Sequence, residues 1–131
     1  MESIVEAGSY GRTVSVRLAP NEDVAEAIGE VCRTCGITQA VVRSGVGSLI
    51  DACIESGNDG SWLAVQGPAV ELLSLCGDVR PDEQGHPRAT LVATVGDPTG
   101  AVFAGRLAYG QNRICVTAEV VLQEWLPTAT A

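Results

Sequence analysis

Residues 89–107 read ATLVATVGDPTGAVFAGRL, with two runs of apolar and small residues on either side of Asp97-Pro98-Thr99-Gly100. Proline at the second and glycine at the fourth position of these four residues are typical of a type I turn. The stretch therefore predicts a β-hairpin, with one strand over residues 89–95 and the next over residues 101–107.

Similar runs occur on both sides of this hairpin. Residues 10–18 alternate, with Val14, Val16 and Leu18 on one side, which predicts a strand with one face exposed to water. Glycine-rich or polar segments separate the other runs, and the polar loop over residues 80–87 is the longest of them. Besides the hairpin, we expect strands over residues 10–18, 37–43, 49–56, 62–65, 70–79 and 114–125.

A single helix is predicted over residues 22–35. Asn21 is the expected N-cap, and Gly36 is expected to end the helix. The apolar side chains that recur at helical spacing, and that should form its buried stripe, are Val24, Ile28, Val31 and Cys35. One main helix with about seven or eight strands predicts an α+β fold with a mostly antiparallel sheet.

The length of 131 residues predicts one domain over residues 1–131, with its core over about 10–126 and a frayed tail over 127–131. Hydrophobic residues make up 46% of the chain and charged residues only 18%. A small chain of this composition has more apolar surface than one subunit can bury. We therefore expect a homo-oligomer.

The charge balance argues against nucleic acid and anionic membranes as direct partners. The formal net charge is −8, and all eight basic residues are arginines. Phosphate binding depends on Lys and Arg, and the sequence has no basic cluster. The N-terminus lacks the features of a signal peptide, and the odd count of five cysteines is typical of reduced thiols. These observations predict a cytoplasmic location without membrane association, and the lysine-free composition indicates a bacterial source.

Three features suggest chemistry but have a plainer structural explanation. Cys32 and Cys35 form a C-x-x-C pair at the end of the predicted helix, where the dipole disfavours a thiolate, so a structural role is expected. His86, the only histidine, lies in a polar loop without a nucleophile pattern around it. Gly45 and Gly47 lack the following lysine of a phosphate loop, and they either make a tight strand connection or line a pocket.

Four blocks, in this order along the chain, resemble one family. They are Ser44-Gly45-Val46-Gly47-Ser48-Leu49, Leu73-Ser74-Leu75-Cys76-Gly77-Asp78, Gly96-Asp97-Pro98-Thr99-Gly100 followed by Phe103-Ala104-Gly105-Arg106-Leu107, and Ala118-Glu119-Val120-Val121-Leu122. The family is the PPC domain (plants and prokaryotes conserved), which in plants occurs beside AT-hooks. The similarity covers roughly residues 13–125.

The resemblance implies a homotrimer of α+β subunits, each with a strongly curved antiparallel sheet and one main helix. Plant members regulate transcription and grip DNA through a separate AT-hook. The Arg-Gly-Arg-Pro core of an AT-hook is absent here. A DNA-binding label taken from the family would therefore lack the segment on which it depends.

The resemblance also implies a metal site that this sequence does not reproduce. Many prokaryotic members have three histidines, two in an H-x-H on the strand before the turn and one in G-G-H-L. The matching positions here are Thr90, Val92 and Arg106. Valine and arginine are not useful zinc ligands. We therefore expect no metal and no cofactor.

Arg106 is the leading candidate for a binding residue because it replaces a family ligand and should project into the same cleft between subunits. A guanidinium in a partly dry cleft needs an anionic partner. That partner is either Glu119 or Glu55, which gives a structural ion pair, or a small anion. The residues predicted to form such an anion site are Arg106, Thr90, Arg43, Ser48, Gly45, Gly47 and Glu119.

Three functions remain open from the sequence. The first is a non-catalytic trimeric binding or regulatory module that takes a small anion or a partner protein. The second is an enzyme that uses the cleft, which the lack of an acid–base pair or catalytic triad disfavours. The third is a transcriptional regulator in direct contact with DNA, which the acidic charge disfavours.

Overall fold

The chain, described over residues 1–128 in a computed structural model, begins with a strand and one helix and continues entirely as strands and turns. The elements are β1 (Gly8–Leu18), α1 (Val24–Cys35), β2 (Ala40–Leu49), β3 (Ala52–Ser56), β4 (Ser61–Val65), β5 (Val70–Pro81), β6 (Pro87–Gly96), β7 (Val102–Leu107) and β8 (Ile114–Pro127).

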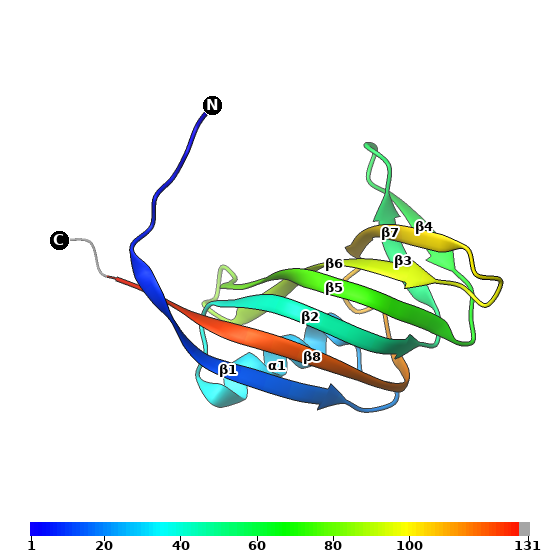
Figure 1. Ribbon diagram of the computed structural model, residues 1–131, viewed down its shortest axis with the longest axis horizontal. Helices are drawn as coiled ribbons and strands as arrows, with labels where there is room; N and C mark the ends of the chain where they lie inside the picture. The colour runs from blue at the N-terminus through cyan, green and yellow to red at the C-terminus, as the bar shows by residue number, and fades with distance from the viewer. Residues whose placement is uncertain (129–131) are drawn as a thin grey trace.

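All eight strands of the described chain belong to one open sheet, in the order β1-β8-β2-β5-β6-β7-β3-β4. Every pairing is antiparallel. Figure 1 shows α1 behind the sheet, and the β3–β4 hairpin rising from its far end. The predicted α+β class, with one helix and an antiparallel sheet, is confirmed.

The predicted hairpin over residues 89–107 is confirmed and consists of β6 and β7. The Gly100 N–H donates to the Asp97 carbonyl at 3.0 Å, which closes the turn. The Asp97 carboxylate accepts from the backbone N–H groups of Thr99 and Ala101, and these bonds hold the loop in place. β6 and β7 then pair from Gly96 with Val102 onward.

The helix is present, but two details of its prediction are wrong. Its N-cap is Asp23, whose carboxylate accepts from the Glu26 N–H, whereas Asn21 has a positive φ of 70° in the preceding turn. The Asp23 side chain also accepts from the buried Asn112 N–H at 2.8 Å, which explains why it takes the cap. The buried stripe of the helix contains Cys32 and not the predicted Cys35, which is exposed. Gly36 ends the helix at φ 70°, as expected.

The glycine-rich block is not a connection between strands. Residues 44–49 lie inside β2, which pairs with β5 on one side and with β8 on the other. A Cβ on Gly45 would lie 2.7 Å from a Leu75 side-chain carbon, and a Cβ on Gly47 would meet Thr117 and Ala118 of β8. The glycines are needed because neighbouring strands approach closely here.

Other strand boundaries differ from the prediction. The run over residues 49–56 is divided into the end of β2 and a separate β3, with Ile50 and Asp51 between them. At the C-terminus Pro127 still pairs with Gly8, and the Thr128 N–H donates to the Ala7 carbonyl. These two residues, which the prediction assigns to a frayed tail, are thus held by backbone hydrogen bonds, and the rest of that predicted tail, positions 129–131, lies outside the described chain.

The core lies between α1 and one face of the sheet. Leu18, Ile28, Leu91 and Leu122 are among its largest fully buried side chains. The opposite face, which we call the outer face, has no helix over it among residues 1–128. No helix of the described chain is long and apolar enough to cross a bilayer.

Candidate functional site

The middle of the outer face carries small and apolar side chains. Val46 of β2 and Val92 of β6 are 55% and 46% exposed, and Leu73 of β5 is 42% exposed. Between them lie the short side chains of Ser74 and Thr94, which are directly paired across β5 and β6. Apolar side chains grouped on one face of a sheet and left in contact with water are typical of an interaction surface, which makes the outer face a candidate interface.

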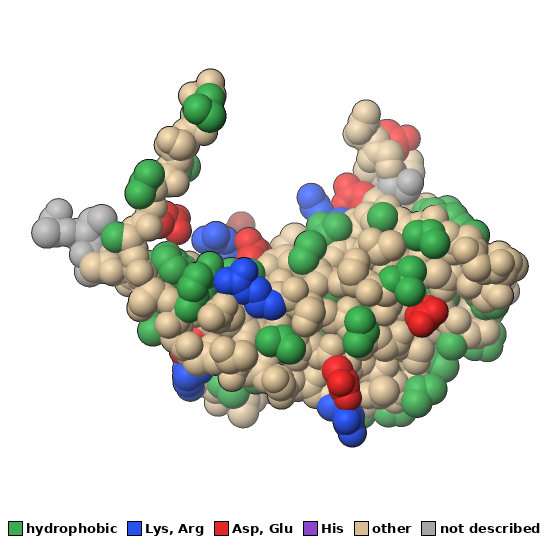
Figure 2. Space-filling model, viewed as in Figure 1, with side chains coloured by type: hydrophobic (Ala, Val, Ile, Leu, Met, Phe, Trp, Pro, Cys, Tyr) green, Lys and Arg blue, Asp and Glu red, His purple; other side chains and the backbone are tan. Residues whose placement is uncertain are grey.

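Six charged side chains on this face form three ion pairs, whereas Arg43 of β2 and Glu71 of β5 belong to no ion pair of the described residues. The pairs are Arg17–Glu119, Arg80–Asp78 and Arg106–Glu55. Figure 2 shows the face with hydrophobic and uncharged side chains over its middle, and blue and red mostly toward its edges. An apolar centre with a polar rim is the usual arrangement of a protein–protein interface.

Arg106 lies in a row of cross-strand neighbours that spans five strands. In the register of the sheet Cys76 is opposite Val92, Val92 is opposite Arg106, and Arg106 is opposite Glu55. Glu55 is in turn opposite Trp62 of β4, whose side chain is exposed. Sequence spacing could not reveal this row, because it depends on β7 pairing with β3 across a long connection.

The contact between Arg106 and Glu55 leaves most of the guanidinium free. The Arg106 Nη1 atom is 3.7 Å from the Glu55 Oε2 atom, and the two side chains are 60% and 30% exposed. At that separation the pair is an ion pair and not a hydrogen bond. Of the two carboxylates considered from the sequence, Glu55 is therefore the partner, and Arg106 keeps donors for another anion.

The positions that correspond to the family histidines are close together but do not suit a metal. Val92 is directly opposite Arg106, and Thr90 lies two residues further along β6 on the same face. Together they offer one hydroxyl, one aliphatic group and one cation, which is the wrong donor set for zinc. Among residues 1–128 no group of three or more His, Cys, Asp or Glu side chains could hold a metal ion.

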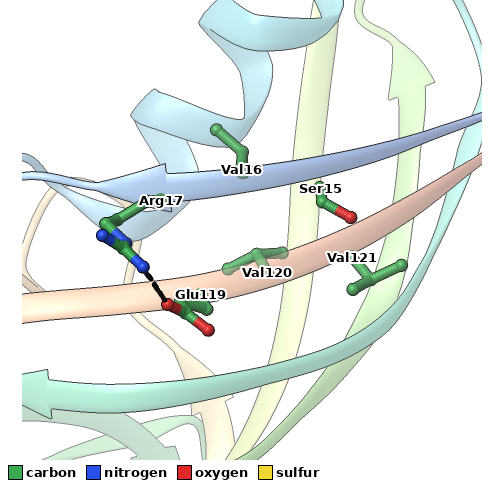
Figure 3. A pocket seen from close by; sticks show the side chains of 6 residues that line it. All are labelled: Ser15, Val16, Arg17, Glu119, Val120 and Val121. Atoms are coloured by element: carbon green, nitrogen blue, oxygen red, sulfur yellow. Dashed lines mark hydrogen bonds and ion pairs between the residues drawn. The ribbon is translucent and has the colours of Figure 1, made fainter.

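Glu119 lies far from Arg106, at the seam between β1 and β8. Its Oε1 atom accepts from the Arg17 Nη2 and Nε atoms at 2.7 and 3.2 Å, beside a hollow of about 430 Å³. Figure 3 shows this bond joining the two strands. Both charges are matched within the pair, so the hollow offers no free charge to a ligand.

The other predicted ligands, Arg43, Ser48, Gly45 and Gly47, all belong to β2. Arg43 donates to the Gln123 side chain at 3.0 Å and lies over the Tyr10 ring, and the Ser48 hydroxyl accepts from the Val116 N–H. β2 and β7 are separated by β5 and β6, about 14 Å in total. Within one protomer the predicted set is therefore divided into two groups.

Two ionisable clusters have a structural role. Glu124, a buried acid that the sequence analysis did not identify, accepts from the Arg12 Nε and Nη2 atoms at 2.9 Å and from the Arg12 N–H. These hydrogen bonds lower the pKa of Glu124 to about 2. Burial, reinforced by Cys35, raises the pKa of Cys32 to about 11, so this thiol stays protonated at neutral pH.

The fold and this face together define a class: an α+β domain built on an open antiparallel sheet, with one helix on the inner face and none over the outer face among residues 1–128. The family model of the Plants and Prokaryotes Conserved (PCC) domain matches residues 5–126. The chain therefore belongs to that family.

Solved structures agree with this assignment. A plant- and prokaryote-conserved protein of Pyrococcus horikoshii has a TM-score of 0.83 and 26% identity, with 98% of this chain and 87% of that chain covered. A metal-containing protein of Archaeoglobus fulgidus has a TM-score of 0.78 and 22% identity, with coverages of 97% and 89%. A protein of Bacteroides thetaiotaomicron, provisionally named as DNA-binding, has a TM-score of 0.74 and 18% identity, with coverages of 89% and 83%. The last two show the fold alone, and no curated protein sequence matches the chain.

Proposed function

We propose that the chain is a non-catalytic binding module that works as a homotrimer through its outer face. The observation that carries this proposal is the charge-poor, partly apolar centre of that face, where Val46, Leu73 and Val92 are exposed and no helix of the described chain lies over them. Burying such side chains between copies gives about 25 cal/mol for each Å² of apolar surface removed from water.

The proposed ligand is a small anion bound by Arg106 at a boundary between subunits. Arg106 and Thr90 of one copy form one half of the site. The group on β2 is too distant to complete it in the same protomer, so a joint site needs a second copy, and either Arg43 or Ser48, which are about 16 Å apart along β2, supplies the other half. The exposed guanidinium, held only loosely by Glu55, supports this assignment.

A thermal-shift assay tests the anion site, with acetate and inorganic phosphate as probes. We expect both probes to raise the Tm of the unmodified protein and Arg106→Met to abolish that rise. Glu55→Gln should enlarge it, because the guanidinium loses its competing carboxylate. Arg17→Met is the matched control, since it also removes an exposed, paired arginine from the outer face.

Equal anion-dependent shifts in Arg106→Met, Arg17→Met and the unmodified protein would overturn the assignment. Duplex DNA belongs in the same panel, because the provisional name of one structural neighbour suggests it. With a net charge of −8, we expect no stabilisation by DNA at moderate salt. A DNA-dependent shift would favour the regulator with direct DNA contact over the anion-binding module.

A further inference from the structure

The first seven residues form an extended segment, which we call the N-terminal arm. Figure 1 shows it next to the start of β1 and extending away from the body of the molecule. Its apolar side chains Ile4 and Val5 are 91% and 93% exposed. The Ala7 carbonyl accepts from the Thr128 N–H, so strand pairing continues up to the base of the arm. Two fully exposed, β-branched residues on an extended segment are typical of a strand that lacks its partner.

The two edges of the sheet are unequal. β1 at one edge carries Arg12 and Arg17 and has an irregularity in its pairing with β8 between Tyr10 and Thr13, features that discourage further pairing. β4 at the other edge reads SWLAV, without a charge or a proline, and has no second partner strand among residues 1–128. The N–H and C=O groups along its outer side are therefore available to another strand.

The arm cannot reach β4 of its own chain. Seven interstrand spacings separate β1 from β4, about 34 Å along the sheet. Seven fully extended residues span at most about 24 Å. Figure 1 shows the arm and the β3–β4 hairpin at opposite ends of the molecule. An arm that pairs with β4 must come from a second copy.

We propose that the N-terminal arm of one copy adds as a further strand to the β4 edge of a neighbouring copy. Successive residues of a strand point to opposite faces, so one of Ile4 and Val5 packs beside the exposed Trp62 and the other beside the half-buried Leu63. This inference rests on the proposed homotrimer, because it needs a neighbouring copy at hand.

Hydrogen exchange measured by mass spectrometry tests the proposal on the full chain and on a variant that lacks residues 2–7. We expect the amides of β4 to exchange on the order of tenfold faster in the deletion variant, because their partner strand is lost. The double substitution Ile4→Ser and Val5→Ser keeps the length of the arm and should have the same effect. Glu2→Gln is the matched control and should leave β4 protected.

Three results would overturn the proposal. If β4 exchanges at the same rate with and without the arm, the arm does not pair there. If the Ile4→Ser and Val5→Ser variant, which keeps Ala7, instead shows faster exchange at the Trp125 end of β8, the arm folds onto its own chain. The molar mass measured on the same samples separates failure of this proposal from failure of the proposed function. A trimer with unchanged β4 exchange would contradict only the pairing of the arm. A monomeric full chain would contradict both the pairing of the arm and the homotrimer.

Discussion

Two arginine–carboxylate pairs in this chain differ in how completely the arginine is used. Arg12 donates three hydrogen bonds to the buried Glu124 and joins the start of β1 to the end of β8. Arg106 approaches Glu55 only to 3.7 Å and stays exposed. The first pair stabilises the fold, and the second leaves a cation available for binding. The family resemblance pointed to Arg106, but the sequence did not reveal the first pair, because Glu124 lies directly before Trp125 in a mostly apolar run and is 112 positions away from Arg12.

The Arg12–Glu124 pair predicts a particular pH dependence of stability. The folded-state pKa of Glu124, about 2, lies below its usual 4.5, so the carboxylate stabilises the fold above pH 4.5 and loses that effect as pH falls toward 2. Glu124→Gln should therefore have a lower Tm than the unmodified protein at pH 7, and the difference should shrink as pH falls through this window. Thermal unfolding followed by circular dichroism measures it.

Glu30→Gln is the control for this prediction, because Glu30 forms an exposed pair with Arg33 at 3.8 Å. Such surface pairs contribute little to stability. The control should match the unmodified protein at every pH. A Tm difference for Glu124→Gln that stays constant from pH 7 to pH 2 would contradict the stated role of the pair.

At the scale of elements, local sequence patterns predicted which strands and turns form more reliably than where each of them begins and ends. Alternation located β1, and the Asp97–Gly100 turn located the β6–β7 hairpin, since each signal is contained in a few residues. For the glycine-rich block the sequence offers a strand connection or a pocket lining, because glycine favours turns and allows close approach of a ligand. In the structure these glycines allow neighbouring strands to pack closely. Gly45 packs against Leu75 and Gly47 against Ala118, and both contacts join residues that are far apart in the sequence.

This explanation of the glycines predicts the effect of Gly47→Ala. A Cβ at Gly47 would overlap the Thr117 carbonyl and Ala118, and the φ of 157° is one that L residues rarely adopt. We expect a loss of about 2 kcal/mol or more in the free energy of unfolding, measured by urea denaturation.

Gly96→Ala is the matched control, because its Cβ would lie 3.6 Å from the Leu73 side chain and 4.0 Å from the Ala101 carbonyl, both ordinary contact distances. It should change the free energy of unfolding by less than about 0.5 kcal/mol. Equal losses for both variants would show that Gly47 has no special role in the contact between β2 and β8.

At the scale of the whole molecule, the fold class followed from the sequence and the arrangement of the site did not. The order β1-β8-β2-β5-β6-β7-β3-β4 brings Arg106 beside Glu55 and separates both from Glu119. Cross-strand contacts of this kind depend on which distant strands pair, and no periodicity within a strand contains that information. Val92 and Arg106, which lie where the resemblance implies histidines, are directly paired across β6 and β7.

The outer face links the fold to the proposed function, because an apolar patch on a sheet face that no helix of residues 1–128 covers is typical of a protein–protein contact. If the chain is a trimer as proposed, Val46 and Val92 are buried between subunits in solution, although both are about half exposed in the single chain. Substituting them with glutamate should leave the protomer folded and place repelling charges at the interface.

Light scattering coupled to size-exclusion chromatography at micromolar concentration tests the proposed trimer most directly, because it measures the molar mass in solution. For the 13.5 kDa chain we predict a molar mass of about 40 kDa. The variant with Val46→Glu and Val92→Glu should fall to the mass of one chain, while Gln84→Glu with Gln111→Glu, which adds the same charge on exposed loops, should stay trimeric. A monomeric mass for the unmodified protein, or a trimer untouched by both glutamates on the outer face, would contradict the account.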